Sequence, residues 1–346
     1  MINVLIIGLG RIGAGNIGLA GDMLLSHLAA VRATPGFVIS GLVDSDPAAR
    51  AAVLAGYPDI EANKLFGDLG DVPMQTGEVI VLCTPASVRS AVIKQTLKRR
   101  PHLVVVEKPL AISIDEARQI VLDAKRAQTM IRVNFHRRFD PRHRHWRAMA
   151  PAKPQAIVMR YSKGMMNYAS HMIDLLLDWY GPIEAVQTFA LPDSRATDPS
   201  PSFCCHMRAG FDAVAIGIDR LTYDQFEIDI LGVGECLKIA AGGADIRRYA
   251  PVVGLHYKGY SHLAEVERDR DIGPVGGFAE FYAAIAAHLR DDVPLPGCDG
   301  HSALTGMAVL EAVWRSFAAG GVAVAPEPTL LRDQLVIHAE ARTKND

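Results

Sequence analysis

The feature that most constrains this chain is a glycine-rich turn that follows directly on an apolar strand near the N-terminus. Residues 4–7 have the composition of a buried strand, and Gly8, Gly10 and Gly13 follow it with the spacing G-x-G-x-x-G. The first glycine allows a tight turn, the second lets the backbone approach a pyrophosphate, and the third allows a helix to pack closely on the strand. The pattern predicts a dinucleotide-binding turn. The residues expected to contact the cofactor are Gly8, Gly10, Arg11, Ile12 and Gly13.

An acidic residue is expected at the end of the second strand, where it accepts hydrogen bonds from the ribose hydroxyls. Asp44 ends the apolar stretch 37–43 and lies 31 residues after Gly13, farther than usual. The glycine-rich stretch 14–21 explains the excess as an inserted loop, so the first helix is expected from about residue 23 to 32. Asp44 would repel a 2′-phosphate and so favours NAD over NADP. The alternative role is a helix N-cap, which Ser45 or Asp46 could also provide.

Two further apolar strands end in residues suited to line a crevice. Residues 79–83 lead into Thr84 and Pro85, and residues 104–106 lead into Glu107, Lys108 and Pro109. In an open α/β sheet, ligands bind at the carboxyl ends of the strands, so Lys108 is expected at the mouth of a cofactor crevice. An ordinary surface ion pair of Glu107 with Lys108 is the alternative.

The alternation of strands and helices ends near residue 129, and the pattern then changes. We expect an N-terminal Rossmann domain, a doubly wound parallel sheet, over residues 1–129. Residues 130–346 are expected to form a C-terminal α+β domain with a large mixed or antiparallel sheet, because its strands follow one another and alternate polar with apolar residues. These strands are expected at 156–161, 183–191, 203–211, 214–220, 226–232 and 235–240, with amphipathic helices at 277–289 and 302–317.

Composition excludes several classes of partner. The 346 residues include 36 basic and 38 acidic ones, so no basic field would attract nucleic acid or an anionic membrane. None of the five cysteines forms a C-x-x-C pair, and their spacing predicts neither a disulfide framework nor a zinc site, so no metal is expected. The absence of a signal segment or a membrane-spanning apolar run indicates a cytoplasmic protein.

One polar stripe interrupts an apolar helix in the second half. Asn167, His171 and Asp174 occupy positions i, i+4 and i+7 of a helix expected over residues 167–180, so they are expected on one face. Three polar side chains on one stripe are costly to bury without partners, and a site would provide them. A structural polar network is the alternative. Arg137 belongs to a basic run where the chain leaves the first domain; such runs usually face solvent, but one arginine here could line the crevice.

Taken together, these motifs resemble the Gfo/Idh/MocA family of NAD(P)-dependent oxidoreductases, which act mostly on sugars and polyols. The resemblance rests on the glycine turn, Asp44, Thr84-Pro85, Glu107-Lys108-Pro109, Arg137-Arg138-Phe139-x-Pro141 and His171-x-x-Asp174. It implies that Lys108 and His171 are catalytic, that Asn167, Asp174 and Arg137 contact a carbohydrate substrate, and that Thr84, Pro85, Glu107 and Lys108 help to hold the cofactor. It also implies a homo-oligomer, a dimer or tetramer.

The chain departs from the family pattern at three side chains. Asn167 stands where many relatives have aspartate, and Ser87 and Arg89 replace the usual asparagine and histidine after Thr-Pro. The expected function is hydride transfer between NAD and a carbinol or ketone carbon of a sugar, polyol or nucleotide sugar. The alternative is a non-catalytic regulatory protein of the same fold that senses NAD and a sugar.

Overall fold

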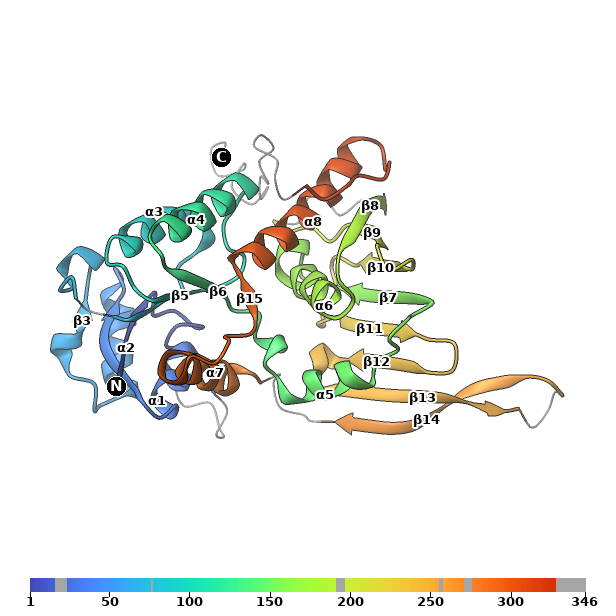
Figure 1. Ribbon diagram of the computed structural model, residues 1–346, viewed down its shortest axis with the longest axis horizontal. Coiled ribbons are helices and arrows are strands. Elements are labelled where there is room, and N and C mark those ends of the chain that lie inside the picture. Colours follow the sequence, from blue (N-terminus) through green and yellow to red (C-terminus); the bar gives the residue numbers. More distant parts are fainter. Residues whose placement is uncertain (16–23, 76, 191–196, 255–257, 271–275, 328–346) are drawn as a thin grey trace. The chain divides into compact units, whose positions relative to one another are not determined.

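The chain folds into two compact units, each with its own sheet (Figure 1). The computed structural model describes residues 1–15, 24–75, 77–190, 197–254, 258–270 and 276–327. Unit 1 contains residues 1–141 and 276–304, and unit 2 contains residues 142–275 and 305–346. The expected N-terminal Rossmann domain and C-terminal α+β domain are thus confirmed as fold classes.

Unit 1 is built on a sheet with the strand order β15-β6-β5-β4-β1-β2-β3. All neighbouring pairs are parallel except β15 with β6, which is antiparallel. The central strands β1, β4 and β5 are apolar and almost fully buried, as parallel strands covered on both faces must be. The strands are β1 (Ile2–Ile7), β2 (Phe37–Val43), β3 (Leu65–Phe66), β4 (Val79–Leu82), β5 (Leu103–Val106), β6 (Met130–Val133) and β15 (Cys298–Asp299).

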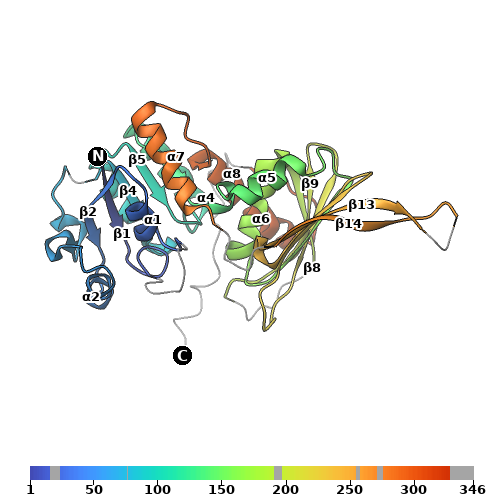
Figure 2. The same cartoon turned by 90° about the horizontal axis from the view of Figure 1, so that it is seen from below.

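Helices cover both faces of this sheet. Side chains of α1, α2 and α7 share one apolar core with β1, β4 and β5, while α3 and α4 contact each other on the other side (Figures 1 and 2). Asp46, not Asp44, caps α2 through the backbone N–H of Ala48, and Ser113 caps α4 as its sequence predicts. The helices are α1 (His27–Ala33), α2 (Pro47–Gly56), α3 (Ala86–Leu97), α4 (Ile114–Arg126) and α7 (Phe278–Asp291).

Unit 2 is built on an eight-stranded mixed sheet in the order β14-β13-β12-β11-β7-β10-β9-β8. Only β7 and β10 pair in parallel. One face of the sheet packs on α6 and α8 through a continuous apolar core, and the side chains that alternate with that core are partly exposed. The strands are β7 (Ala156–Tyr161), β8 (Ile183–Ala190), β9 (Ser202–Met207), β10 (Asp212–Gly217), β11 (Phe226–Leu231), β12 (Cys236–Ala240), β13 (Asp245–Val253) and β14 (Ser261–Arg270); the helices are α5 (Pro141–Met149), α6 (Ser170–Tyr180) and α8 (Gly300–Ala318).

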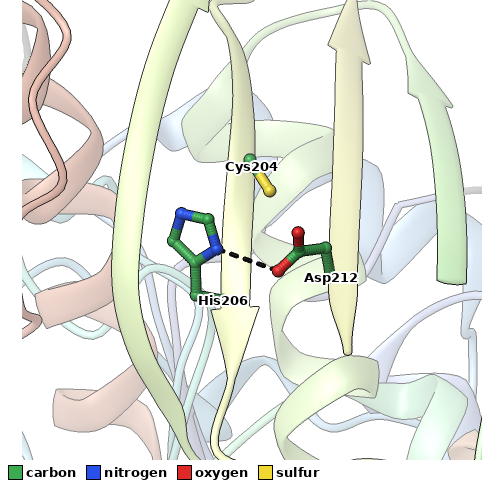
Figure 3. Close-up of side chains that lie close together, drawn as sticks. All are labelled: Cys204, His206 and Asp212. Atoms are coloured by element: carbon green, nitrogen blue, oxygen red, sulfur yellow. Dashed lines mark hydrogen bonds and ion pairs between the residues drawn. The ribbon is translucent and has the colours of Figure 1, made fainter. Parts of the chain in front are cut away.

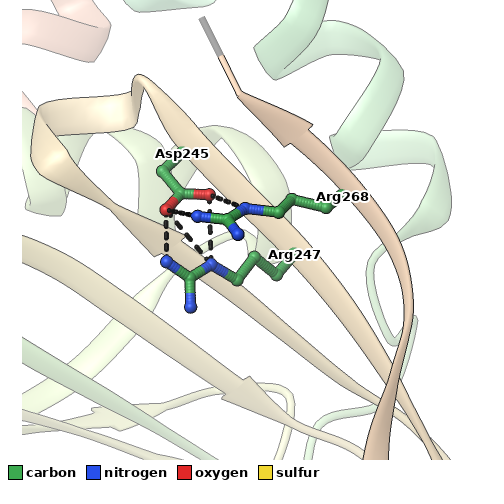
Figure 4. Close-up of polar contacts among 3 residues, drawn as sticks. All are labelled: Asp245, Arg247 and Arg268. Carbon is green, nitrogen blue, oxygen red and sulfur yellow. Dashed lines mark hydrogen bonds and ion pairs between the residues drawn. The ribbon is translucent and has the colours of Figure 1, made fainter. Parts of the chain in front are cut away.

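The last two strands, β13 and β14, were not expected from the sequence. They pair along nine register positions and are held at one end by a charged cluster. Asp245 is 7% exposed and accepts hydrogen bonds from Arg247 on its own strand and from Arg268 on β14 (Figure 4). These guanidinium groups hold the pKa of Asp245 well below its usual range, with Arg247 the larger contributor, so the carboxylate is charged at neutral pH.

Three boundaries differ from the sequence expectation. The units divide at residue 141 instead of 129, because β6 completes the parallel sheet and residues 276–304 return to it. The first helix begins at His27; the glycine-rich stretch 14–21 lies mostly outside the described residues. The strand expected at 203–211 ends at Met207 as β9, since Gly210 adopts φ +88° in the turn that leads to β10.

Candidate functional site

The glycine turn after β1 has the geometry that its sequence predicts. Gly8 adopts φ +92°, and a Cβ there would lie 2.8 Å from the carbonyl carbon of Cys83. A Cβ at Gly13 would lie 1.9 Å from the carbonyl oxygen of Gly8. At Gly10, by contrast, a Cβ would meet no atom within 4 Å. Gly8 and Gly13 are therefore needed for close packing, whereas Gly10 leaves the backbone open to a ligand.

Asp44 joins the end of β2 to this turn. Its Oδ2 accepts a hydrogen bond from the backbone N–H of Leu9 at 2.7 Å, and its Oδ1 accepts one from Asp46 N–H at 2.9 Å. Each carboxylate oxygen retains a second lone pair that a ribose hydroxyl could use. Asp44 thus fixes the shape of the glycine turn and remains on the wall of the adjacent cavity.

A cavity of about 670 Å³ opens at the carboxyl ends of β1, β2, β4 and β5. This volume lies within the range of cofactor pockets, and the position is the one where open α/β sheets bind ligands. The open face at Gly10, the Asp44 carboxylate and the cavity size all fit a dinucleotide. The lining includes Gly8, Gly10, Ile12, Asp44, Thr84, Pro85, Arg89, Glu107 and Lys108.

Glu107, which lines the cavity, is held in place by a buried hydrogen-bond network. Its Oε1 lies 2.9 Å from Nε2 of His27 and accepts a hydrogen bond from the side-chain amide of Asn134 at 2.6 Å. Nδ1 of His27 lies 2.7 Å from the hydroxyl of Tyr282 on α7. His27 and Tyr282 are fully buried, and Asn134 is 3% exposed. The network connects four segments of unit 1 that lie far apart in the sequence.

Burial alone would raise the pKa of Glu107, because it penalises the charged carboxylate. The hydrogen bonds and charge of His27, together with the amide of Asn134, outweigh burial and leave the pKa below its usual value. Glu107 is therefore a carboxylate at neutral pH.

Arg89 joins two loops of the same cavity. It lies on α3, is 2% exposed, and donates hydrogen bonds from its guanidinium to the backbone oxygens of Thr84 and Pro109. Burial lowers the pKa of Arg89 to about 10, so it remains charged at neutral pH. Arg89 holds the turn after β4 against the residue that follows Lys108, a role that its place in the sequence did not reveal.

A short basic turn follows β6 in unit 1. Arg137 and His136 lie in the 3-10 turn His136–Arg138, and both are partly buried. Nδ1 of His136 lies 3.0 Å from the carbonyl oxygen of Gly276, and its ring stacks on Phe278. Burial and the charge of Arg137 lower the pKa of His136 to about 4, so the imidazole is neutral near pH 7.

The polar residues expected on one helix of unit 2 lie in two kinds of helix. His171 and Asp174 are on α6 and are 7% and 5% exposed. Asn167 is exposed and lies in the preceding π-helical turn, Met165–Ala169. Both Oδ atoms of Asp198 anchor that turn by accepting the backbone N–H groups of Met166 and Asn167 at 3.0 and 2.9 Å. A π-helical turn changes the angular spacing of residues, so the expected single α-helical face does not extend to Asn167.

The predicted residues fall into two groups. Apart from Arg137, ten of the thirteen predicted site residues belong to the turn and strand ends of unit 1, whereas Asn167, His171 and Asp174 belong to unit 2. Arg11 is exposed and does not line the cavity. His27, Asn134 and Tyr282 were not predicted. Asn134 directly follows β6, and a polar residue at the carboxyl end of a strand was the available signal.

The fold and cavity define unit 1 as a Rossmann domain of the dinucleotide-binding class. Residues 2–135 match the model of the GFO_IDH_MocA oxidoreductase family, described as an NAD-binding Rossmann fold. A stretch of 64 residues is 31% identical to the uncharacterized oxidoreductase YrbE of Bacillus subtilis. That stretch spans only 18% of this chain and 18% of the relative's length. An NAD-binding oxidoreductase domain is therefore supported for the N-terminal part.

Solved structures share the fold over nearly the whole chain. The WlbA dehydrogenase from Bordetella pertussis, solved with NADH and UDP-GlcNAcA, matches with a TM-score of 0.71 and 20% identity over 94% of this chain and 98% of that one. A super-repressor mutant of Gal80p from Saccharomyces cerevisiae matches with a TM-score of 0.74 and 15% identity over 98% of both chains. At these identities the likeness establishes the fold. Within the described residues, no helix combines the length and apolar character needed to cross a membrane.

Proposed function

We propose that this protein is an NAD-dependent oxidoreductase of the Gfo/Idh/MocA family that transfers a hydride between nicotinamide and a carbinol or ketone carbon of a sugar, polyol or nucleotide sugar. The observation that carries the proposal is the cavity of unit 1, whose lining combines the glycine turn, Asp44 and Lys108. We also propose that the protein is cytoplasmic and forms a homo-oligomer.

The residues assigned to the cofactor are those of the turn and the strand ends. Gly8, Gly10, Ile12 and Gly13 would hold the pyrophosphate, with Arg11 beside them, and Asp44 would accept the ribose hydroxyls. Thr84, Pro85 and Glu107 would line the nicotinamide end. When bound, NAD supplies the carbon that accepts or donates the hydride, and the protein supplies alignment and charge.

Lys108 and His171 are assigned the proton chemistry. The ammonium of Lys108 would stabilise negative charge that develops on the substrate oxygen. His171 would accept the hydroxyl proton or donate one to the ketone, because imidazole is the side chain that titrates closest to neutral pH. Asn167, Asp174 and Arg137 would orient neighbouring hydroxyl groups of the substrate.

Support for a carbohydrate substrate comes from the similarity to WlbA, whose structure contains a nucleotide sugar. A second candidate function is supported by the equally extensive similarity to Gal80p, described as a super-repressor mutant. In that reading, the chain would bind NAD and a sugar as a regulator and would not turn them over. The two candidates differ in one observable, which is NADH formation.

The decisive experiment compares wild type with Lys108→Met. NADH formation is measured over a panel of polyols, free sugars and nucleotide sugars, and NAD binding is measured separately by calorimetry. We expect kcat to fall by about 10²-fold or more while NAD affinity changes little, because the variant loses the ammonium group that acts on the substrate oxygen during the reaction. Lys125→Met is the matched control, because Lys125 is exposed on α4 and is not part of the cavity lining.

The outcomes separate the two candidates. Turnover that is lost in Lys108→Met and kept in Lys125→Met supports the enzyme. Unchanged kcat in Lys108→Met contradicts the role of this lysine. Tight NAD binding without turnover on any member of the panel supports the regulatory protein.

A further inference from the structure

Three side chains of types that can bind metals form a cluster on the sheet of unit 2. The proposed oxidoreductase reaction does not use these residues. Figure 3 shows Cys204 and His206 on one strand, β9, and Asp212 on the neighbouring strand, β10. One ligand atom from each residue lies within 4.8 Å of the others. Nδ1 of His206 is 2.8 Å from Oδ1 of Asp212. The sulfur, nitrogen and oxygen donors therefore converge on one small volume.

The strand register accounts for this convergence. Residues two apart on a strand face the same side of the sheet, so Cys204 and His206 share a face. Asp212 is the direct cross-strand partner of His206, and Val214 is the partner of Cys204, which places the carboxylate diagonally opposite the thiol. Phe203 and Cys205 point to the other face and are fully buried in the apolar core. The cluster is thus fixed by a rigid antiparallel pair.

We propose that Cys204, His206 and Asp212 form a binding site for a zinc ion. Thiolate, imidazole and carboxylate are the ligand types that Zn²⁺ uses in proteins. Tetrahedral bonds of ordinary length place zinc ligand atoms about 3.3 to 3.6 Å apart. The present separations, from 2.8 Å to at most 4.8 Å, differ from this by about 1 Å, which rotation of side chains can supply. Three protein ligands leave the fourth position to water.

The surroundings allow an ion to enter. The side chains of His206 and Asp212 are 36% and 57% exposed, and Cys204 has a free thiol that is partly buried. On the adjoining strand β8, Gln187 is the cross-strand partner of Cys204 and Ala185 is the partner of His206. These neighbours are uncharged, so neither opposes a cation at the site. In the sequence, the ligands are separated by one and by five residues, and no zinc motif announces them.

The test uses Co²⁺ as a spectroscopic probe for zinc on the full-length protein. A thiolate bound to Co²⁺ gives a near-ultraviolet charge-transfer absorption that imidazole and carboxylate ligands do not give. We expect about one Co²⁺ per chain with this absorption, and its displacement by Zn²⁺. Cys204→Ser should abolish the absorption, while His206→Gln and Asp212→Asn should weaken binding at least about tenfold.

Cys205→Ala is the matched control, because Cys205 is the adjacent residue on the same strand but faces the opposite side. Binding with the thiolate absorption in this variant, and its loss in Cys204→Ser, supports the site. Wild type that binds no Co²⁺, or Cys204→Ser with wild-type affinity, overturns the proposal and leaves only an ion pair of His206 with Asp212. Asp212 is exposed, so the Asp212→Asn variant tests the site even if a change at Cys204 disturbs the fold.

Discussion

Single side chains of unit 1 have structural roles that the local sequence does not indicate. Asp44 is a ligand-facing carboxylate and also the acceptor that fixes Leu9 in the glycine turn. Arg89 is a buried cation that joins the backbones of Thr84 and Pro109. In both cases one residue sets the shape of the cavity and contributes charge to its wall. Substitutions at these positions therefore act on ligand preference and on loop position together.

Asp44→Asn tests the proposed preference for NAD. The substitution removes the negative charge and keeps a side-chain oxygen that can accept the Leu9 N–H. Because repulsion of the 2′-phosphate is lost, we expect the ratio of NADP affinity to NAD affinity to rise at least about tenfold, or about 1.4 kcal/mol. Calorimetric titration with each cofactor measures the ratio. Asp71→Asn, on an exposed residue outside the cavity lining, should leave it unchanged.

At the scale of elements, hydrophobic periodicity predicted the strands and helices that bury one face or both. The parallel strands of unit 1 were predictable because they are short apolar runs, and β7, β11 and β12 because their polar and apolar residues alternate. The ribbon formed by β13 and β14 was not predictable in this way, because β14 is largely exposed and its polar and apolar residues hardly alternate. The stabilising contacts of this ribbon are charged pairs between strands, which one-dimensional patterns do not reveal.

The cluster of Asp245 with Arg247 and Arg268 gives that ribbon a testable anchor. Asp245→Asn keeps the size of the side chain but leaves two guanidinium groups without their carboxylate. Since both arginines are about one-third exposed, solvent reduces the penalty, and we expect the free energy of unfolding to fall by about 1 to 2 kcal/mol. Urea unfolding measures it. Glu265→Gln, an exposed change of equal charge on β14, should cost less than about 0.5 kcal/mol, and an equal loss in both variants would contradict the anchor.

At the scale of the whole molecule, sequence reasoning found the fold class of both units and eight of the residues that line the unit 1 cavity; Arg11 and Gly13, which were also predicted to contact the cofactor, are not part of the lining. It did not find the network of His27, Asn134 and Tyr282, because these residues meet only in three dimensions. It also could not relate His206 to Asp212, since the strand expected at 203–211 runs through the turn at Gly210 and Asp212 lies outside both expected strands. Long-range contacts between polar residues are the information that local periodicity lacks.

The depressed pKa of His136 predicts acid sensitivity of the whole fold. Its pKa is about 4 in the folded state and near 6.5 in an unfolded chain, so below pH 6.5 the unfolded state binds a proton that the folded state does not. We expect this histidine to remove about 1 to 2 kcal/mol of stability between pH 7 and pH 5. His136→Gln should therefore show a smaller loss over this interval than wild type in urea unfolding. His102→Gln, at an exposed histidine, is the control, and equal pH dependence of all three proteins would contradict the prediction.

The return of residues 276–304 to unit 1 also governs the order in which this protein can be completed during synthesis. Tyr282 and Phe281 of α7 are fully buried in the core of a domain whose other residues are translated more than 130 positions earlier. The ribosome must therefore make residues 142–275 of unit 2 before the core of unit 1 can close. The chain passes between the units three times, after residues 141, 275 and 304, and the first two crossings lie close together, since Gly276 N–H donates to Asp140 Oδ2 at 2.9 Å. The segment 142–275 is in this sense an insertion into unit 1 whose two ends lie close together.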